Sequence, residues 1–120
     1  MRQKCACKGF FLDRLIQPAV LLFLSREDLH GFSLLKKLAE SDFMDREGVD
    51  PTGLYRTLRK MEKDGLLTSR WDHTASPPKR VYVLTGEGRE CLANWRTTLL
   101  RYRGNIDRLT RAIAEGCERT

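Results

Sequence analysis

The middle of the chain carries four polar side chains whose spacing suits contact with a polyanion. They occur in the stretch DPTGLYRTLRKMEKD, residues 50–64, and are Thr52, Arg56, Arg59 and Lys63. At 100° per residue they project from one side of a helix. A hydroxyl and a row of cations on one face can donate hydrogen bonds to the phosphates and base edges of a DNA groove. The same pattern also occurs on ordinary solvated helices, so the neighbouring elements must decide between the two readings.

The stretch is built to form a helix of its own. Asp50 is a favoured N-cap, and Pro51 follows at the first helical position, where its missing N–H costs nothing. The opposite side is apolar and predicts burial of Leu54, Leu58 and Met61. Tyr55 lies on the flank between the two faces, and Gly65 predicts the helix end.

Composition describes one globular domain. The chain has 120 residues, with 41% hydrophobic and 32% charged residues. Its net charge of +6 and pI near 9.4 suit a polyanionic partner, although basic proteins without one are common. No apolar run approaches the roughly 18 residues of a membrane span, and the start lacks a signal-peptide layout, so we expect a cytoplasmic protein.

The cysteines predict neither a disulfide framework nor a complete metal site. They are Cys5, Cys7, Cys91 and Cys117. We expect reduced thiols, with residues 1–9 forming a flexible basic arm. A metal or redox role for Cys5 and Cys7 is the alternative, although two thiolates do not complete the four ligands of structural zinc. We therefore expect no cofactor and no metal.

Two further helices precede the stretch. Residues 10–25 are apolar over most of a helix surface, and Pro18 requires the helix either to begin near Gln17 or to bend there. Residues 26–31 read as a polar turn, in which His30 is a turn or packing residue because no nucleophile accompanies it. Residues 32–41 predict an amphipathic helix, whose inward side chains are expected to be Leu34, Leu35, Leu38 and Ala39. Residues 42–49 predict an acidic loop.

A β-hairpin should follow the cationic helix. LLTSRW at 66–71 and RVYVL at 80–84 are strand-like, and the turn-rich segment between them contains Pro77 and Pro78. Three helices followed by a hairpin make a winged helix-turn-helix. We expect Lys79 and Arg80 at the tip of the wing, where they would touch phosphate or enter a minor groove.

The last helix carries an unbroken apolar seam. Thr85 caps it, Glu87 lies in its first turn, and Gly104 and Asn105 would permit a bend. The seam has alternating spacings of three and four residues and consists of Leu92, Trp95, Leu99, Tyr102, Ile106, Leu109 and Ile113. A second copy of the helix is its simplest partner. Trp95 is either a seam residue or part of a pocket for a planar ligand.

At this point the sequence resembles the PadR family of winged-helix regulators. The matching blocks are HGFSLLKKL, LYRTLRKMEKDGLLTSRWD and KRVYVLTGEGRECL, with Phe32 where the family usually has tyrosine. The single last helix resembles the short subgroup, and within it the polyhydroxybutyrate-responsive repressors. The resemblance runs from about residue 18 through the last helix and does not include the Cys-x-Cys arm.

The resemblance implies a homodimer that binds double-stranded operator DNA, usually as a repressor. It places the LYRTLR helix in a major groove and the wing in the flanking minor groove. The implied contacts are Thr52, Gly53, Tyr55, Arg56 and Arg59, with Lys79 and Arg80 on the wing. Some short members of the family bind planar drugs between aromatic residues at the dimer centre. The corresponding dimer and effector positions here are Leu92, Trp95, Leu99, Tyr102 and Ile106.

These patterns predict a mainly α fold with a small β-hairpin. The expected parts are the arm at 1–9, a winged helix-turn-helix domain at 10–85 and a dimerisation helix at 86–120. The predicted function is a dimeric, sequence-specific transcriptional regulator, a repressor modulated by a small-molecule effector. A winged-helix adaptor that binds protein without reading DNA is the alternative. We expect no enzyme, because no nucleophile elbow, phosphate loop or metal triad is present.

Overall fold

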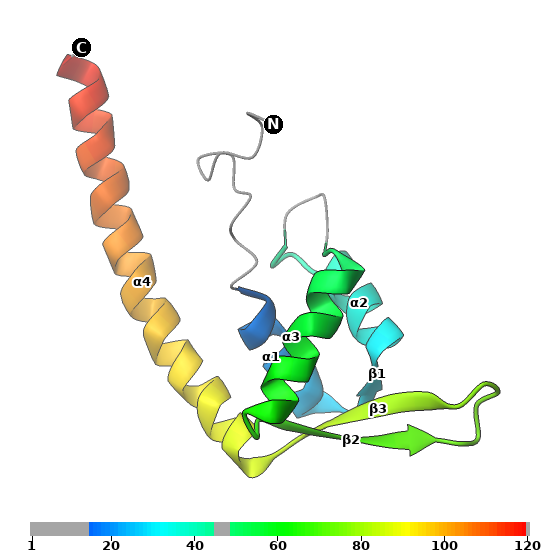
Figure 1. Ribbon diagram of the computed structural model, residues 1–120. Helices are drawn as coiled ribbons and strands as arrows, with labels where there is room; N and C mark the ends of the chain where they lie inside the picture. The colour runs from blue at the N-terminus through cyan, green and yellow to red at the C-terminus, as the bar shows by residue number, and fades with distance from the viewer. Residues whose placement is uncertain (1–14, 45–48, 120) are drawn as a thin grey trace.

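The computed structural model describes residues 15–44 and 49–119 of the chain (Figure 1). The predicted arm at 1–9 and the first residues of the predicted helix at 10–25 lie outside this part. The elements in chain order are α1 (Ile16–Arg26), β1 (Leu29–His30), α2 (Gly31–Glu40), α3 (Pro51–Lys63), β2 (Leu67–Asp72), β3 (Lys79–Leu84) and α4 (Gly86–Arg119).

The core lies where the first three helices meet the inner end of the sheet. Its largest fully buried side chains are Leu21, Leu34, Leu38, Leu54, Leu58, Met61, Leu67 and Val20. Every one of α1, α2, α3 and β2 contributes to this set, so no single element is stable by its own pattern alone. The three helices and the sheet form the predicted winged helix.

Helix α1 begins at Ile16, which places Pro18 in its first turn. An N–H in the first turn has no partner within the helix, so proline is tolerated there and no bend is needed. Of the two alternatives for Pro18, a start near Gln17 is therefore confirmed. Most of the helix surface is buried, as its apolar content predicts.

In α2 one inward prediction is wrong. Leu34 and Leu38 are fully buried, whereas Ala39 is exposed. Ala39 lies one turn beyond Leu35 on the flank of the helix, and only the longer leucine side chain packs against the core.

The sheet has one strand more than the predicted hairpin. Its order is β1-β3-β2, with both pairs antiparallel. The short β1 joins Leu29 to Tyr82 and His30 to Val81, so the expected polar turn at 26–31 contains a strand. Two residues are too few to show a period-two pattern, and the pairing is set by the tertiary fold.

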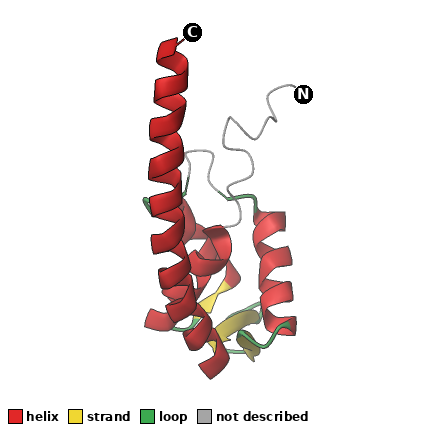
Figure 2. Cartoon of the chain, turned by 90° about the vertical axis from the view of Figure 1, so that its left-hand side faces the viewer, coloured by secondary structure: helices red, strands yellow, loops and turns green. Residues whose placement is uncertain are grey.

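Helix α4 leaves the winged helix at its root and extends away from it (Figures 1 and 2). Thr85 caps it as predicted: its Oγ1 accepts from the Gly88 N–H at 3.0 Å and donates to the Gly65 carbonyl at 2.7 Å. The helix runs unbroken for 34 residues through Gly104 and Asn105. No helix in the described part of the chain is long and apolar enough to span a membrane.

Candidate nucleic-acid interface

Helix α3 is fixed at both ends and along one side. The Asp50 carboxylate accepts a hydrogen bond from the Gly53 N–H at 3.1 Å, and Pro51 occupies the first turn. Leu54, Leu58 and Met61 are all 0% exposed. After the helix ends, Gly65 adopts a φ of +84°, a left-handed conformation that glycine reaches at little cost. These contacts fix which side of α3 faces solvent.

The solvent side of α3 carries the predicted polar row. Thr52, Arg56, Arg59 and Lys63 are all exposed. Among the described residues, no carboxylate lies within salt-bridge distance of these three cations, whereas the neighbouring Lys60 is paired with Asp64 at 3.3 Å. The cationic row is therefore available to an external anion.

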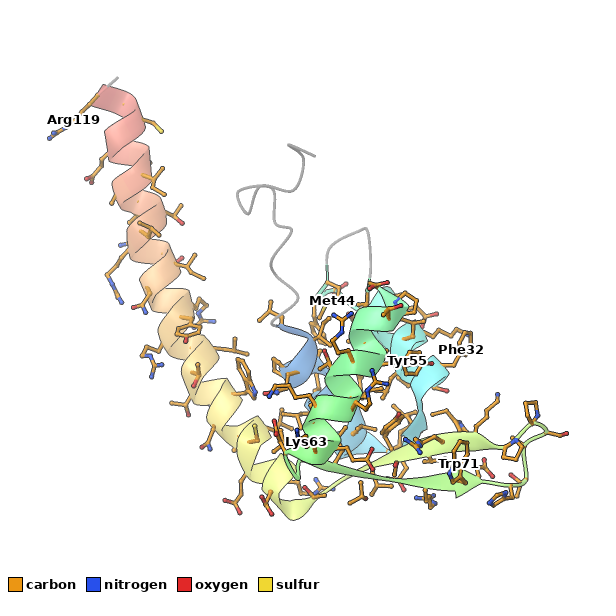
Figure 3. The ribbon with its side chains drawn as sticks, in the orientation of Figure 1. Phe32, Met44, Tyr55, Lys63, Trp71 and Arg119 are labelled. Atoms are coloured by element: carbon orange, nitrogen blue, oxygen red, sulfur yellow. The ribbon has the colours of Figure 1, made fainter. Side chains whose placement is uncertain are left out.

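Tyr55 has a packing role that its sequence position did not reveal. Its side chain is 38% exposed, and its ring lies against the first residue of α2. A Cβ added to Gly31 would lie 2.5 Å from Tyr55 Cε1. Glycine at position 31 thus permits the close approach of α2 and α3, while the rest of the Tyr55 ring faces outward with Phe32 nearby in the view of Figure 3.

The wing cations lie in β3 and not at the tip, which corrects the sequence prediction. Lys79 pairs with Asp72 and Arg80 with Trp71 across the hairpin, so the tip comprises residues 73–78. Because side chains alternate along a strand, Lys79 and Arg80 project from opposite faces of the wing. The Arg80 guanidinium carbon lies 5.1 Å from the centre of the Trp71 ring.

One face of the wing is turned toward α3. The Ser69 hydroxyl donates to the Glu62 carboxylate of α3 at 2.7 Å. Tyr82, opposite Ser69, is buried, and this burial raises the pKa of its hydroxyl, while the nearby Arg80 cation partly opposes the shift. The cation of Arg80 therefore belongs to the surface between the wing and α3.

The other face of the wing is tied to the start of α2. His30 Nε2 lies 3.1 Å from the Asp72 carboxylate, which also accepts hydrogen bonds from the backbone and hydroxyl of Thr74. The Thr74 hydrogen bonds, with a smaller contribution from His30, lower the pKa of Asp72. His30 is thus a packing residue that joins β1 to the wing, as predicted.

A groove separates the root of α4 from α1. Its volume is about 810 Å³, and it is lined by apolar side chains of both helices, including Leu22, Leu92 and Leu99. Trp95 lines it too, and its indole N–H donates to Gln17 Oε1 at 2.9 Å. Three arginines of α4 also line the groove, at one-heptad intervals: Arg89, Arg96 and Arg103.

The seam of α4 divides into two parts. Leu92 and Trp95 pack against the core of the winged helix. Tyr102, Ile106, Leu109 and Ile113 are exposed, although they continue the same stripe. Of the five predicted dimer or effector positions, Leu92, Trp95 and Leu99 line the groove, whereas Tyr102 and Ile106 lie beyond it.

The described residues hold no cluster of three or more His, Cys, Asp or Glu side chains that would bind a metal. Cys5 and Cys7 lie outside the described residues. Cys91 is half-buried beside Trp95, and its burial raises the pKa of its thiol, so it is a poor nucleophile at neutral pH.

The model of the transcriptional regulator PadR-like family matches residues 20–94, from within α1 through the wing to the first part of α4. The chain belongs to the PadR-like family of transcriptional regulators. The resemblance seen in the sequence and the predicted fold class are thus confirmed.

Other transcriptional regulators resemble this chain, one by its sequence and two by their solved structures. The transcriptional regulator Rv3488 of Mycobacterium tuberculosis is 32% identical over 80 residues, which are 67% of this chain and 71% of the relative. A PadR family regulator from Eggerthella lenta is 31% identical, with a TM-score of 0.62 over 75% of this chain and 79% of its own. Bacillus subtilis PadR, in complex with operator DNA, is 25% identical, with a TM-score of 0.61 over 68% of this chain and 45% of its own.

Sequence reasoning did not single out one exposed aromatic residue beside the wing cations, Trp71. Its side chain is 54% exposed beside Arg80. The two residues are partners only in the register that starts from the Leu67–Leu84 pair, and the sequence alone did not fix that register.

Proposed function

We propose that this PadR-family chain is a homodimeric repressor that binds palindromic operator DNA and responds to a small-molecule effector. The observation that carries the proposal is the unpaired polar row on the outer side of α3. The complex of Bacillus subtilis PadR with operator DNA supports it, because that relative shares the fold.

DNA contact is assigned to two elements. Thr52, Tyr55 and Arg56 would reach base edges in a major groove, with Gly53 allowing close approach of the helix backbone. Arg59 and Lys63, farther along α3, would meet phosphates. The wing cations Lys79 and Arg80 would contact the DNA backbone beside that groove. Phosphate contacts would supply most of the affinity and make it fall with added salt.

The exposed stripe of α4 supports the dimer. Ile106 and Leu109 are each 61% exposed, on a helix that carries an apolar residue at every seam position out to Ile113. Burial of this stripe against its own copy removes it from water and places two α3 helices about a two-fold axis. Such a dimer reads half-sites separated by about one turn of DNA, roughly 34 Å.

The groove between α1 and α4 is the proposed effector site. Its volume of about 810 Å³ falls within the roughly 300–1,000 Å³ of ligand pockets. Trp95 offers a flat ring, and the three arginines that line the groove favour a planar molecule with negative charge. An occupant would alter how α4 meets α1, and so shift the population of dimers whose α3 helices match the operator spacing.

Selection of bound fragments from genomic DNA tests the proposal as a whole. A repressor of this kind enriches a palindromic sequence, whereas a winged-helix adaptor enriches none. The anionic dye anilinonaphthalene sulfonate serves as the first probe of the groove. Its fluorescence should rise with the wild-type protein and much less with Trp95→Ala.

The substitution Arg56→Ala tests the contact assignment. We expect operator affinity to fall about tenfold or more, since a good base contact contributes about 1–3 kcal/mol. Fluorescence anisotropy with a labelled operator measures the loss, and thermal melting should be unchanged because Arg56 is exposed. Arg111→Ala is the matched control, because it removes the same charge from the side of α4 opposite the seam. Unchanged operator affinity of Arg56→Ala at physiological salt would refute the assignment.

A further inference from the structure

We propose that Trp71 is a positioning residue that holds the Arg80 guanidinium in place for a DNA phosphate beside the major groove. The inference rests on the proposed operator binding and deepens it. Neither the sequence motifs nor the family match assigns a role to Trp71, so the assignment comes from the geometry of the wing.

The two side chains form a cation–π pair near the outer end of the wing strands, one position before the last pair of the hairpin. They are directly opposite each other in the β2–β3 register. The guanidinium carbon of Arg80 lies 5.1 Å from the ring centre of Trp71, within the roughly 6 Å of a cation–π contact. Arginine stacks on a ring with its flat face and leaves its N–H groups directed outward from the edge.

The pair is on the face of the wing that is turned toward α3. Ser69, Trp71, Arg80 and Tyr82 share that face, because directly opposed residues of antiparallel strands lie on the same side and side chains alternate. The Ser69–Glu62 hydrogen bond connects this face to α3. Figure 3 shows Trp71 on the hairpin and Lys63 on the neighbouring end of α3.

Exposure separates the functional role from a packing role. Trp71 is 54% exposed, which is unusual for a side chain that serves only the core. It lies outside the buried cluster formed by α1, α2, α3 and the inner end of the sheet. Contact with the ring holds the Arg80 guanidinium on this side of the wing, so that without Trp71 the phosphate contact would form in only part of the complexes.

Lys79 provides an internal comparison. It is the adjacent cation of β3, it projects from the opposite face of the wing, and it has no ring partner among the described residues. If Trp71 acts through Arg80, its effect on DNA binding must vanish when Arg80 is absent and persist when Lys79 is absent. A double-mutant cycle measures this difference directly.

The experiment compares operator affinities of the full chain by fluorescence anisotropy at several salt concentrations. We expect Arg80→Ala to weaken binding about tenfold and Trp71→Ala about fivefold. The double variant should bind no more weakly than Arg80→Ala alone. In the Lys79→Ala background, Trp71→Ala should still cost about fivefold. Unlike Trp71→Ala, Trp71→Phe should keep operator affinity within about twofold of wild type, because phenylalanine also offers a ring face.

The salt dependence gives a readout that loss of packing would not change. Trp71→Ala removes no charge, yet it should reduce the slope of log affinity against log salt by part of the roughly 0.9 that one phosphate contact contributes, because the contact then forms in only some of the complexes. The variants should melt at the wild-type temperature. If Trp71→Ala does not fold, Arg80→Lys is the second variant. It keeps the charge but loses the planar guanidinium that lies over the ring, and it should lower operator affinity as Trp71→Ala is expected to do.

The outcomes separate this inference from the proposed function. A wild-type chain that enriches no DNA sequence would overturn both. Sequence-specific binding with additive effects of Trp71→Ala and Arg80→Ala would overturn only the inference and would indicate that Trp71 contacts DNA by itself. An unchanged salt slope in Trp71→Ala would also overturn it.

Discussion

Helix α3 and the outer half of α4 have the same apolar spacing but different surroundings. The stripe of α3 is completely buried by other elements of its own chain, whereas Ile106 and Leu109 of α4 are each 61% exposed. Spacing of three and four residues therefore predicts a helix and its apolar side in both places. It does not tell whether the covering surface belongs to the same chain.

The exposed sides of the two helices differ in their chemistry. The apolar side of α3 is fully buried, and the cations of its exposed polar row have no carboxylate partner among the described residues. Outer α4 instead carries an exposed apolar stripe, which favours a partner protein surface over DNA. The molecule thus presents two open surfaces of different chemistry, one on α3 of the winged helix and one on the outer part of α4 (Figure 1).

The largest expected effect comes from a cavity in the core behind α3, which its own chain buries completely. Leu58→Ala should lower the free energy of unfolding by about 2–5 kcal/mol, since it leaves a cavity at a fully buried site. Urea denaturation followed by circular dichroism measures it. Leu109→Ala is the matched control on α4, and its cost should depend on protein concentration because the proposed covering surface is a second chain. Equal, concentration-independent losses in both variants would contradict the comparison.

A smaller effect concerns the packing of α2 against α3 in the same core. Gly31→Ala should cost about 1–3 kcal/mol of unfolding free energy, because its Cβ would overlap the Tyr55 ring. In a Tyr55→Ala background the same change should be neutral or stabilising, since alanine favours the helix over glycine. Thermal melting of the four proteins tests the reversal. The same sign in both backgrounds would show that the ring does not determine the requirement for glycine.

The smallest effect concerns the attachment of the wing. The pKa of Asp72 is lowered from 3.8 in the folded chain, so its contribution to stability is present above that value and is lost as pH falls through the folded pKa. Asp72→Asn should therefore destabilise the chain slightly at about pH 5 and less at about pH 3. Melting temperatures at both pH values measure this, with Asp107→Asn on exposed α4 as the control. A deficit that grows on acidification would contradict the assignment.

Local patterns were enough for the helices and the hairpin. The Asp50 cap, the buried side of α3, the Gly65 terminus and the Thr85 cap each depend on neighbours within a few residues, so the sequence predicted them. The family resemblance extended this to the winged-helix fold, which the family model confirms.

Features that depend on distant residues were missed or misplaced. Ala39 follows the helical period, but whether it reaches the core depends on the elements opposite. Strand β1 is paired only because β3 passes beside it. The ring partner of Arg80 and the contact of Tyr55 with Gly31 likewise require the register and the helix approach to be known. Which residues contact DNA stays a prediction.

The two-residue strand β1 also bears on the order in which the chain folds. Hairpin β2–β3 closes a short loop, but pairing of Leu29 with Tyr82 must bring together residues separated by α2, α3 and the wing. Closing so long a segment costs more chain entropy than closing the hairpin loop, and the two-residue strand forms few hydrogen bonds to offset that cost. We therefore expect β1 to dock after the helices and hairpin have formed, and its amides to be among the first in the sheet to exchange with solvent deuterium.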